Sequence, residues 1–226
     1  MKNFKGKIIA VSLIVIAMLG AFTGYAIKTS KTSKIITVVI DAGHGGIDGG
    51  ASGILTGVRE SDLNLLIAKE LKKLYEDNGF SVVMIRTEDV GLYDTTDTGF
   101  KKRDLNKRVE IINESGADLL VSIHLNVYSS PSRRGAQAFY KKGDILSEKL
   151  AKQIQARING LGIVPRLYNA LWGDYYLLNE SKIPSVIVEC GFLSSPDDER
   201  LLLTENYRFE IANAIFGGSL NALTSY

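Results

Sequence analysis

The sequence predicts a single α/β domain in which a mainly parallel or mixed β-sheet is flanked by helices on both faces, with any active site at the carboxyl ends of the strands. Three observations predict this fold. Apolar runs typical of buried strands alternate with amphipathic helical stretches. The chain has 226 residues, which suits one domain, and 45% of them are hydrophobic, as is usual for a packed core.

The first half of the domain is expected to contain two strands and one long helix. Residues 35–40 (IITVVI) form a continuous apolar run, as in a strand buried on both faces of a parallel sheet. A second strand is expected over residues 80–85 (FSVVMI). Between them a helix is expected from near Ser61 to the Asn-Gly pair at 78–79. Its apolar face carries Leu63, Leu66, Ile67, Leu71 and Leu74.

The second half continues the alternation of helices and strands. A helix capped by Asp104 and ended by Gly116 is expected to direct Leu105, Val109 and Ile112 inward. Strands are expected over residues 119–123, 135–140 and 185–189, and helices from about residue 147 and over about 206–222. No internal repeat or second module follows the core.

The amino terminus has the pattern of an export signal. Three lysines within the first seven residues precede an apolar segment over residues 8–27. Residues 1–27 fit a cleaved signal peptide, because Gly24-Tyr25-Ala26 resembles a cleavage site, and they equally fit a retained membrane anchor, because the segment can span a bilayer. Residues 28–34 (KTSKTSK) are expected to be a linker. The domain would then cover residues 35–226 and act outside the cytoplasm.

Charge and cysteine content exclude two classes of protein. The first 34 residues carry six lysines and no acidic residue, whereas the whole chain has 27 basic and 25 acidic residues. The domain itself is therefore acidic overall, and a nucleic-acid partner is not expected. Cys190 is the only cysteine, which excludes an intrachain disulfide and a cysteine-based zinc cluster. Because it follows Glu189 on a strand, its side chain is expected to point to the opposite face, into the core.

Polar side chains gather at the expected strand ends. His44 follows the first strand, His124 ends the third, and Glu189 ends the last. Ligands of open α/β sheets bind at this edge. Glu60, on the loop before the first helix, could fold over the same edge. Two imidazoles and one carboxylate form a hydrolytic zinc set that leaves the fourth position to water.

Each of these residues also has a purely structural interpretation. Either histidine alone could be a hydrogen-bonded structural residue, Glu60 could complement a helix dipole, and Glu189 could be a paired carboxylate. The glycine-rich loop after the first strand could instead bind phosphate. However, Asp48 stands where the dinucleotide fingerprint needs its third glycine, the helix does not begin at once, and no GxxxxGK[ST] motif is present.

Six ordered blocks identify a resemblance. DAGHGGIDGGASG, RESDLNLLIAKEL, MIRTED, LNKRVEIIN, ADLLVSIHLN and VIVECGFLSSPDDE are similar to blocks of the zinc-dependent N-acetylmuramoyl-L-alanine amidases, over about residues 36–222. The resemblance implies that His44, Glu60 and His124 bind one zinc ion and that Glu189 is the catalytic acid/base. Ala42 and Gly49 stand where the family often has proline, and Ser195 where it commonly has asparagine.

The resemblance implies hydrolysis of the amide between N-acetylmuramic acid and the L-alanine of the stem peptide, with peptidoglycan as substrate. Asn126, Arg86 and Asp48 are motif residues near the same edge, either as substrate or supporting residues or as partners in loop hydrogen bonds. The aromatic residues of LWGDYYLL could line a groove or belong to the core. These are Trp172, Tyr175 and Tyr176.

The domain organisation is most similar to that of spore-cortex amidases of endospore formers, since the sequence shows no wall-binding repeats. That resemblance implies a role in sporulation and germination through formation of muramic-δ-lactam. The enzyme would be membrane-anchored, or secreted to the wall or the spore intermembrane space, and a protein activator is a further expectation. A vegetative autolysin and a catalytically silent wall-binding protein are the alternatives. The presence of all four metal and catalytic residues argues against the silent protein.

Overall fold

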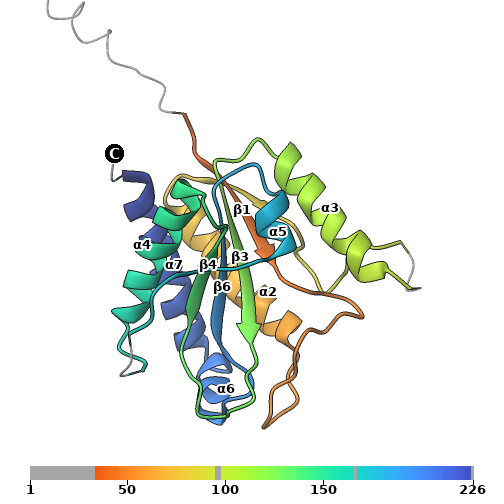
Figure 1. Ribbon diagram of the computed structural model, residues 1–226, viewed down its shortest axis with the longest axis vertical. Coiled ribbons are helices and arrows are strands. Elements are labelled where there is room, and N and C mark those ends of the chain that lie inside the picture. Colours follow the sequence, from red (N-terminus) through yellow and green to blue (C-terminus); the bar gives the residue numbers. More distant parts are fainter. Residues whose placement is uncertain (1–33, 95–97, 165–166, 225–226) are drawn as a thin grey trace, which may run out of the picture. The chain divides into compact units, whose positions relative to one another are not determined.

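A six-stranded mixed sheet forms the centre of the domain (Figure 1). The strand order is β2-β1-β3-β6-β4-β5. β1, β2, β3 and β6 are mutually parallel, β4 runs antiparallel to β6, and β5 pairs parallel with β4. The strands are β1 (Thr37–Ala42), β2 (Ser81–Met84), β3 (Leu119–Asn126), β4 (Gln137–Tyr140), β5 (Leu171–Trp172) and β6 (Ser185–Phe192).

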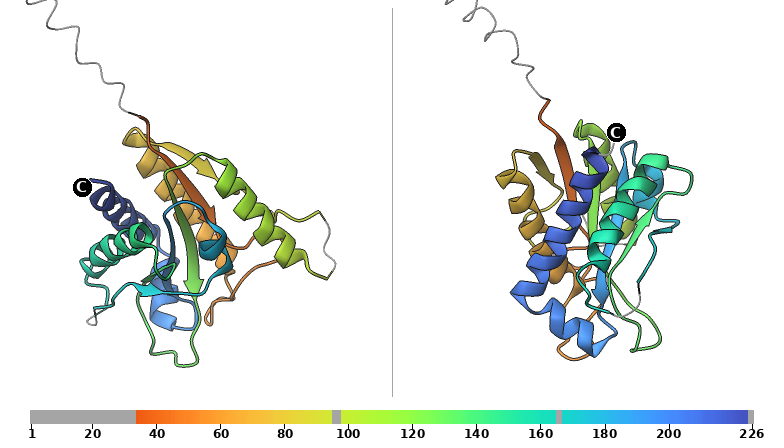
Figure 2. Two further views of the ribbon diagram at one scale, coloured as in Figure 1. Left: turned by 45° about the horizontal axis from the view of Figure 1, so that its top comes forward. Right: turned by 90° about the vertical axis from the view of Figure 1, so that its left-hand side faces the viewer.

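Helices cover both faces of the sheet (Figure 2). The larger apolar core lies between the sheet and α2, α4 and α7, and a smaller one lies between the opposite face and α3 and α5. The helices are α2 (Glu60–Asp77), α3 (Phe100–Glu114), α4 (Ile145–Asn159), α5 (Tyr176–Glu180), α6 (Pro196–Leu202) and α7 (Glu205–Thr224). The predicted α/β fold with a mixed sheet is therefore confirmed.

The computed structural model describes residues 34–94, 98–164 and 167–224. The expected signal peptide or anchor over residues 1–27, and the linker apart from Lys34, lie outside the described residues. Among the residues that are described, no helix is both long enough and apolar enough to cross a membrane.

The continuous apolar runs form the central strands because side chains alternate between two buried layers. On β1, Val38 and Ile40 point toward α2, whereas Val39 points toward α3. β3 and β6 divide their side chains in the same way. Cys190 is fully buried in the larger core, as expected from its position next to Glu189.

Two local expectations were wrong. Asp104 does not cap α3, which begins at Phe100 after Gly99 in the left-handed conformation (φ 94°). Asp104 lies inside the helix, where it accepts hydrogen bonds from the backbone of Leu92 and from Arg108. Leu66 (43% exposed) and Leu105 (36% exposed) were expected to point inward but are exposed.

Three short elements were not predicted. β5 has two residues, α5 has five and α6 has seven, so none is long enough to show a periodic pattern. α6 nevertheless has a clear start, because Ser195 caps it and Pro196 occupies its first turn. The predicted strands over 119–123 and 185–189 also extend further, to Asn126 and Phe192.

The contact between α4 and α7 depends on a glycine. A Cβ atom at Gly218 would lie 2.4 Å from the Cα of Ile154 on α4, whereas a Cβ at Gly217 would approach nothing closer than 3.6 Å. We expect Gly218→Ala to lower the free energy of unfolding by about 1–3 kcal/mol through overpacking. Gly217→Ala is the matched control and should raise it by up to about 1 kcal/mol, through helix propensity.

Urea denaturation followed by circular dichroism measures both changes. An unfolding midpoint of Gly218→Ala equal to or above that of the parent protein would contradict this account of the helix contact.

Candidate metal centre

His44, two residues after the end of β1, is held in an unusual backbone conformation. Its φ is 62°, and it is the only residue other than glycine with a positive φ among the described residues. The guanidinium of Arg108 donates a hydrogen bond to its carbonyl oxygen at 2.6 Å. Its ring donates from Nδ1 to Asp48 Oδ2 at 2.9 Å, which leaves Nε2 facing Glu60. A carboxylate on the far nitrogen is the usual partner of a metal-binding histidine.

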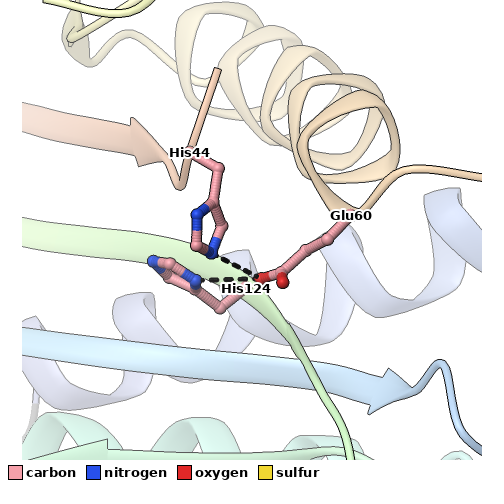
Figure 3. Close-up of side chains that lie close together, drawn as sticks. All are labelled: His44, Glu60 and His124. Atoms are coloured by element: carbon pink, nitrogen blue, oxygen red, sulfur yellow. Dashed lines mark hydrogen bonds and ion pairs between the residues drawn. The ribbon is translucent and has the colours of Figure 1, made fainter. Parts of the chain in front are cut away.

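Glu60 approaches the ring of His44 from the helical layer that contains α2. Glu60 was expected on a loop, but it is the first residue of α2. Its side chain is only 5% exposed. Oε1 lies 3.3 Å from His44 Nε2 and 3.0 Å from His124 Nδ1 (Figure 3). Oε2 accepts a hydrogen bond from the backbone of Ala51. The carboxylate is therefore fixed from both sides.

His124 completes the cluster from β3. Its ring meets the ring of His44 edge-on, with the centroids 5.0 Å apart. A Cβ at Gly43 would lie 2.2 Å from the His124 ring, and a Cβ at Gly50 would lie 2.5 Å from Glu60 Oε2. The glycines of the loop are needed because the three side chains pass directly against its backbone.

The donor set of this cluster fits a zinc ion. His44, Glu60 and His124 each offer one ligand atom, and these atoms all lie within 4.8 Å of one another. Two imidazole nitrogens and one carboxylate oxygen are ligands that zinc accepts, and three protein ligands leave a position open. The three side chains point toward a common centre (Figure 3).

The carboxylates around the cluster shift its proton equilibria. Burial lowers the pKa of His44, but hydrogen bonds and charges from Glu60 and Asp48 outweigh burial and raise it to about 9. Burial raises the pKa of Glu60, yet hydrogen bonds from His124 and His44 bring it far below its usual value. A cation at this centre would take the place of those protons.

Glu189 lies beside the cluster on the neighbouring strand. It pairs with His124 in the register of β3 and β6, so the two side chains leave the sheet on the same face. Burial raises the pKa of Glu189 to about 7, and the negative charge of Glu60 adds to this effect. Its Oε2 atom is buried and has no hydrogen-bond partner among the residues that the structure describes. A carboxyl group with these properties is suited to hold and transfer a proton near neutral pH.

Arg108 is a supporting residue that the sequence analysis did not identify. Its guanidinium forms a buried ion pair with Asp41 and also bonds the carbonyl oxygens of Ala42 and His44. Asp41 in turn accepts a hydrogen bond from Ser122. This network fixes the turn that carries His44. One sequence signal could have identified Arg108: an arginine on the apolar face of a helix stays charged and therefore needs a buried partner.

The three residues expected near the site have different surroundings. Arg86 is buried, and its guanidinium donates to backbone carbonyl oxygens of Ala42, Gly43 and Ser61 and of Glu88, so its contacts are loop hydrogen bonds. Asp48 bonds His44 and pairs with Lys101. The side chain of Asn126 accepts a hydrogen bond from the backbone of the next residue.

A cavity of about 250 Å³ opens in front of the cluster, on the face of the sheet covered by α3 and α5. Its lining includes His44, His124 and Arg108, together with Tyr175 and Tyr176 from the LWGDYYLL segment. These two tyrosines therefore line a groove and are not core residues. Trp172, 55% exposed, is not part of this lining.

Comparison with known proteins identifies the family. The family model Amidase_3, described as N-acetylmuramoyl-L-alanine amidase, matches residues 38–221. The chain belongs to the N-acetylmuramoyl-L-alanine amidases. Its enzyme activity is thus cleavage of the bond between N-acetylmuramic acid and L-alanine, and its substrate is peptidoglycan.

Named relatives of this amidase include a germination-specific enzyme. It is 36% identical to the germination-specific N-acetylmuramoyl-L-alanine amidase of Bacillus subtilis, over 83% of this chain and 79% of the relative. It is 38% identical, with a TM-score of 0.81, to the CwlD amidase of Clostridioides difficile, solved in complex with the GerS lipoprotein; the match covers 84% of this chain and 100% of that one. The N-acetylmuramoyl-L-alanine amidase of Clostridium difficile 630 is 34% identical, with a TM-score of 0.76, over 85% and 99% of the chains.

The raised pKa of His44 gives a direct prediction for the metal-free amidase. We expect the His44 ring to titrate near pH 9 rather than near 6.5. Its charged form stabilises the folded state fully below pH 6.5, and this contribution is lost as the pH rises to about 9. NMR can follow the ring directly, because the chain has only two histidines.

Asp48→Asn removes one of the two carboxylates that bond His44 and should lower this pKa while Glu60 keeps it above 6.5. A parent His44 that titrates at or below 6.5 would show that the carboxylates do not dominate the site.

Proposed function

We propose that this amidase is a zinc enzyme in which His44, Glu60 and His124 hold one zinc ion per chain and Glu189 is the catalytic acid/base. The observation that carries the proposal is the convergence of two imidazoles and one carboxylate beside Glu189 on the adjacent strand. The Oε2 atom of Glu189 is buried and has no partner in the described part of the chain. When bound, the zinc ion would act as a Lewis acid and activate water.

The residues of the chain supply the remaining parts of the reaction. Glu189 Oε2 accepts a proton from the attacking water and later delivers it to the leaving amine nitrogen. Burial raises the pKa of Glu189, which favours the protonated form that delivers the proton to the amine. Asp48 and Arg108 act as positioning residues that hold the ring and the backbone of His44.

The cavity provides a place for the sugar and peptide on either side of the scissile amide. Its lining includes the aromatic rings of Tyr175 and Tyr176 and the ion pair between Lys101 and Asp48. Aromatic rings present flat apolar surfaces to sugar rings, and charged rims recognise polar substituents. This shape supports a substrate that crosses the carboxyl ends of β1 and β3 in front of the zinc site.

We further propose that the amidase acts in spore-cortex maturation, by removing stem peptides before muramic-δ-lactam forms. The support is its similarity to a germination-specific relative and to the CwlD amidase of Clostridioides difficile. Export through residues 1–27, as a signal peptide or an anchor, would place the domain of residues 35–226 outside the cytoplasm. Since the solved relative was captured with a lipoprotein, a lipoprotein is the kind of activating partner we propose.

Substitutions separate metal binding from catalysis. His124→Ala and Glu60→Gln should lower zinc content and activity together. Glu189→Gln should keep about one zinc per chain and lose about 10²- to 10⁴-fold in kcat, because an amide cannot accept the proton. Metal analysis and the release of stem peptides from denuded peptidoglycan measure the two properties.

The opposite pattern, in which Glu189→Gln loses zinc and Glu60→Gln keeps it, would mean that the two carboxylates have exchanged roles. Full activity in both variants would overturn the mechanism, because cleavage would then need neither carboxylate.

The biological role has its own test in the organism that carries the gene. Loss of the protein should leave spores whose cortex lacks muramic-δ-lactam, with normal separation of vegetative cells. Muropeptide analysis of the cortex measures the lactam. Chains of unseparated cells with a normal cortex would instead identify a vegetative autolysin.

A further inference from the structure

A second hollow, of about 420 Å³, lies at the loop that follows β3. Aromatic, hydroxyl and guanidinium groups form its wall, and none of its described lining residues is acidic. The polar and aromatic members are Tyr128, Ser130, Ser132, Arg133, Arg134 and Tyr168. It shares no lining residue with the cavity in front of the zinc site.

Arg133 is the central residue of this hollow. Its guanidinium carbon lies 5.5 Å, 5.3 Å and 5.7 Å from the ring centroids of Tyr128, Tyr168 and Phe192. These distances are within the range of cation–π contacts, which orient the planar group. Its Nε atom is buried, and no described residue gives it a hydrogen-bond partner. Within the described part of the chain, no hydrogen bond or ion pair satisfies the guanidinium.

The neighbouring arginine shows the contrast. Arg134 pairs with Asp197 at 2.9 Å and with Asp198 at 3.1 Å, so its charge is balanced within the fold. The charge of Arg133 is not balanced in this way. A guanidinium that is oriented by aromatic rings and keeps its donors unpaired matches a planar carboxylate, which accepts two parallel hydrogen bonds.

The hollow lies at the same sheet edge as the zinc site. Tyr128 follows His124 by four residues, and Phe192 follows Glu189 by three on the adjacent strand. Three or four residues of fully extended chain span at most about 10–14 Å, so Tyr128 and Phe192 lie no further than this from His124 and Glu189. A stem peptide of four residues spans a similar length when extended, about 13–14 Å. Its free end could therefore reach Arg133 while its first amide lies before Glu189.

We propose that Arg133, seated among Tyr128, Tyr168 and Phe192, binds the terminal carboxylate of the peptidoglycan stem peptide. This inference rests on the proposed placement of the scissile amide at the zinc site. The hollow would make the enzyme selective for stem peptides with a free carboxylate, and it would hold the peptide on the far side of the bond that is cut.

The binding test compares two forms of one wall preparation. Peptidoglycan is stripped of phosphate-containing polymers with hydrofluoric acid, and half of it is converted to carboxamides with carbodiimide and ammonium. Binding of the full-length chain is measured by pelleting, in a Glu189→Gln background that prevents digestion. Arg133→Gln should bind native peptidoglycan about tenfold more weakly than its parent, and the amidated form equally well.

Two further variants control for fold and charge. Arg157→Gln removes an exposed arginine of α4 that bonds Asn221, and it should leave binding to both forms unchanged. Arg133→Lys keeps the positive charge but lacks the planar fork, so it should weaken binding to native peptidoglycan about threefold. It also serves as the test if the Gln variant fails to fold by circular dichroism.

Several outcomes overturn the inference. Equal binding of native peptidoglycan by the parent and both Arg133 variants would do so, as would an equal loss on the native and amidated forms. A loss seen only on unstripped walls would identify phosphate as the ligand and also overturn it. In the cleavage assay, with Glu189 intact, Arg133→Gln should raise KM about tenfold without changing kcat.

The two proposals fail separately. If the parent enzyme does not cleave peptidoglycan but Arg133→Gln still loses carboxylate-dependent binding, the catalytic proposal fails and the carboxylate site stands. If the parent enzyme cleaves peptidoglycan normally and Arg133→Gln has an unchanged KM, the carboxylate proposal fails and the catalytic proposal stands.

Discussion

The buried ion pair between Arg108 and Asp41 is the interaction on which the geometry of the site depends. Burial opposes both charges, yet Arg108 keeps the pKa of Asp41 below its usual value, and Asp41 with Asp104 raises the pKa of Arg108. A buried pair of this kind is strongly destabilised, by about 3–5 kcal/mol, when one partner is removed. Its cost is offset because Arg108 also satisfies carbonyl oxygens of the turn.

That turn sets the position of everything in front of the sheet. The left-handed conformation of His44 is unfavourable for a residue with a side chain, so it persists only because its surroundings fix it. Hydrogen bonds from Arg108 and Arg86 hold the backbone on either side of it, and Asp48 holds the ring. The glycines then let His124 and Glu60 approach the same turn. Strain in one residue is thus balanced by several ordinary contacts.

Sequence patterns were sufficient where a single physical rule applied. Apolar runs of β-branched residues marked the central strands, and the rule that ligands bind at strand ends placed His44, His124 and Glu189 near one another. Glu60 was expected to fold over the same edge from a loop, but only the family resemblance assigned the ligand role to Glu60 and the acid/base role to Glu189. That Glu60 is the first residue of α2 was not deduced from the local sequence. Asp104 has the composition of a helix cap, but tertiary contacts decided its position.

The Arg133 hollow illustrates the same limit. Its aromatic rings come from the loop after β3, from the segment before β5 and from the end of β6, so no short stretch of sequence contains the arrangement. The exposure of Tyr176 and Trp172 could not be deduced either, because aromatic residues satisfy a core pattern equally well. Spatial convergence of distant segments is what a linear pattern does not record.

The proposed ligand cluster draws its members from two layers of the fold, and this arrangement limits which substitutions the surrounding residues tolerate. Both histidines belong to the sheet layer, whereas Glu60 begins a helix that packs on the opposite face through Leu63, Ile67 and Leu71. One residue of helical rise is 1.5 Å, which is large compared with the tolerance of a metal–ligand bond. Substitutions in the apolar layer beneath α2 therefore alter ligand geometry, and divergence there is constrained by chemistry as well as by stability.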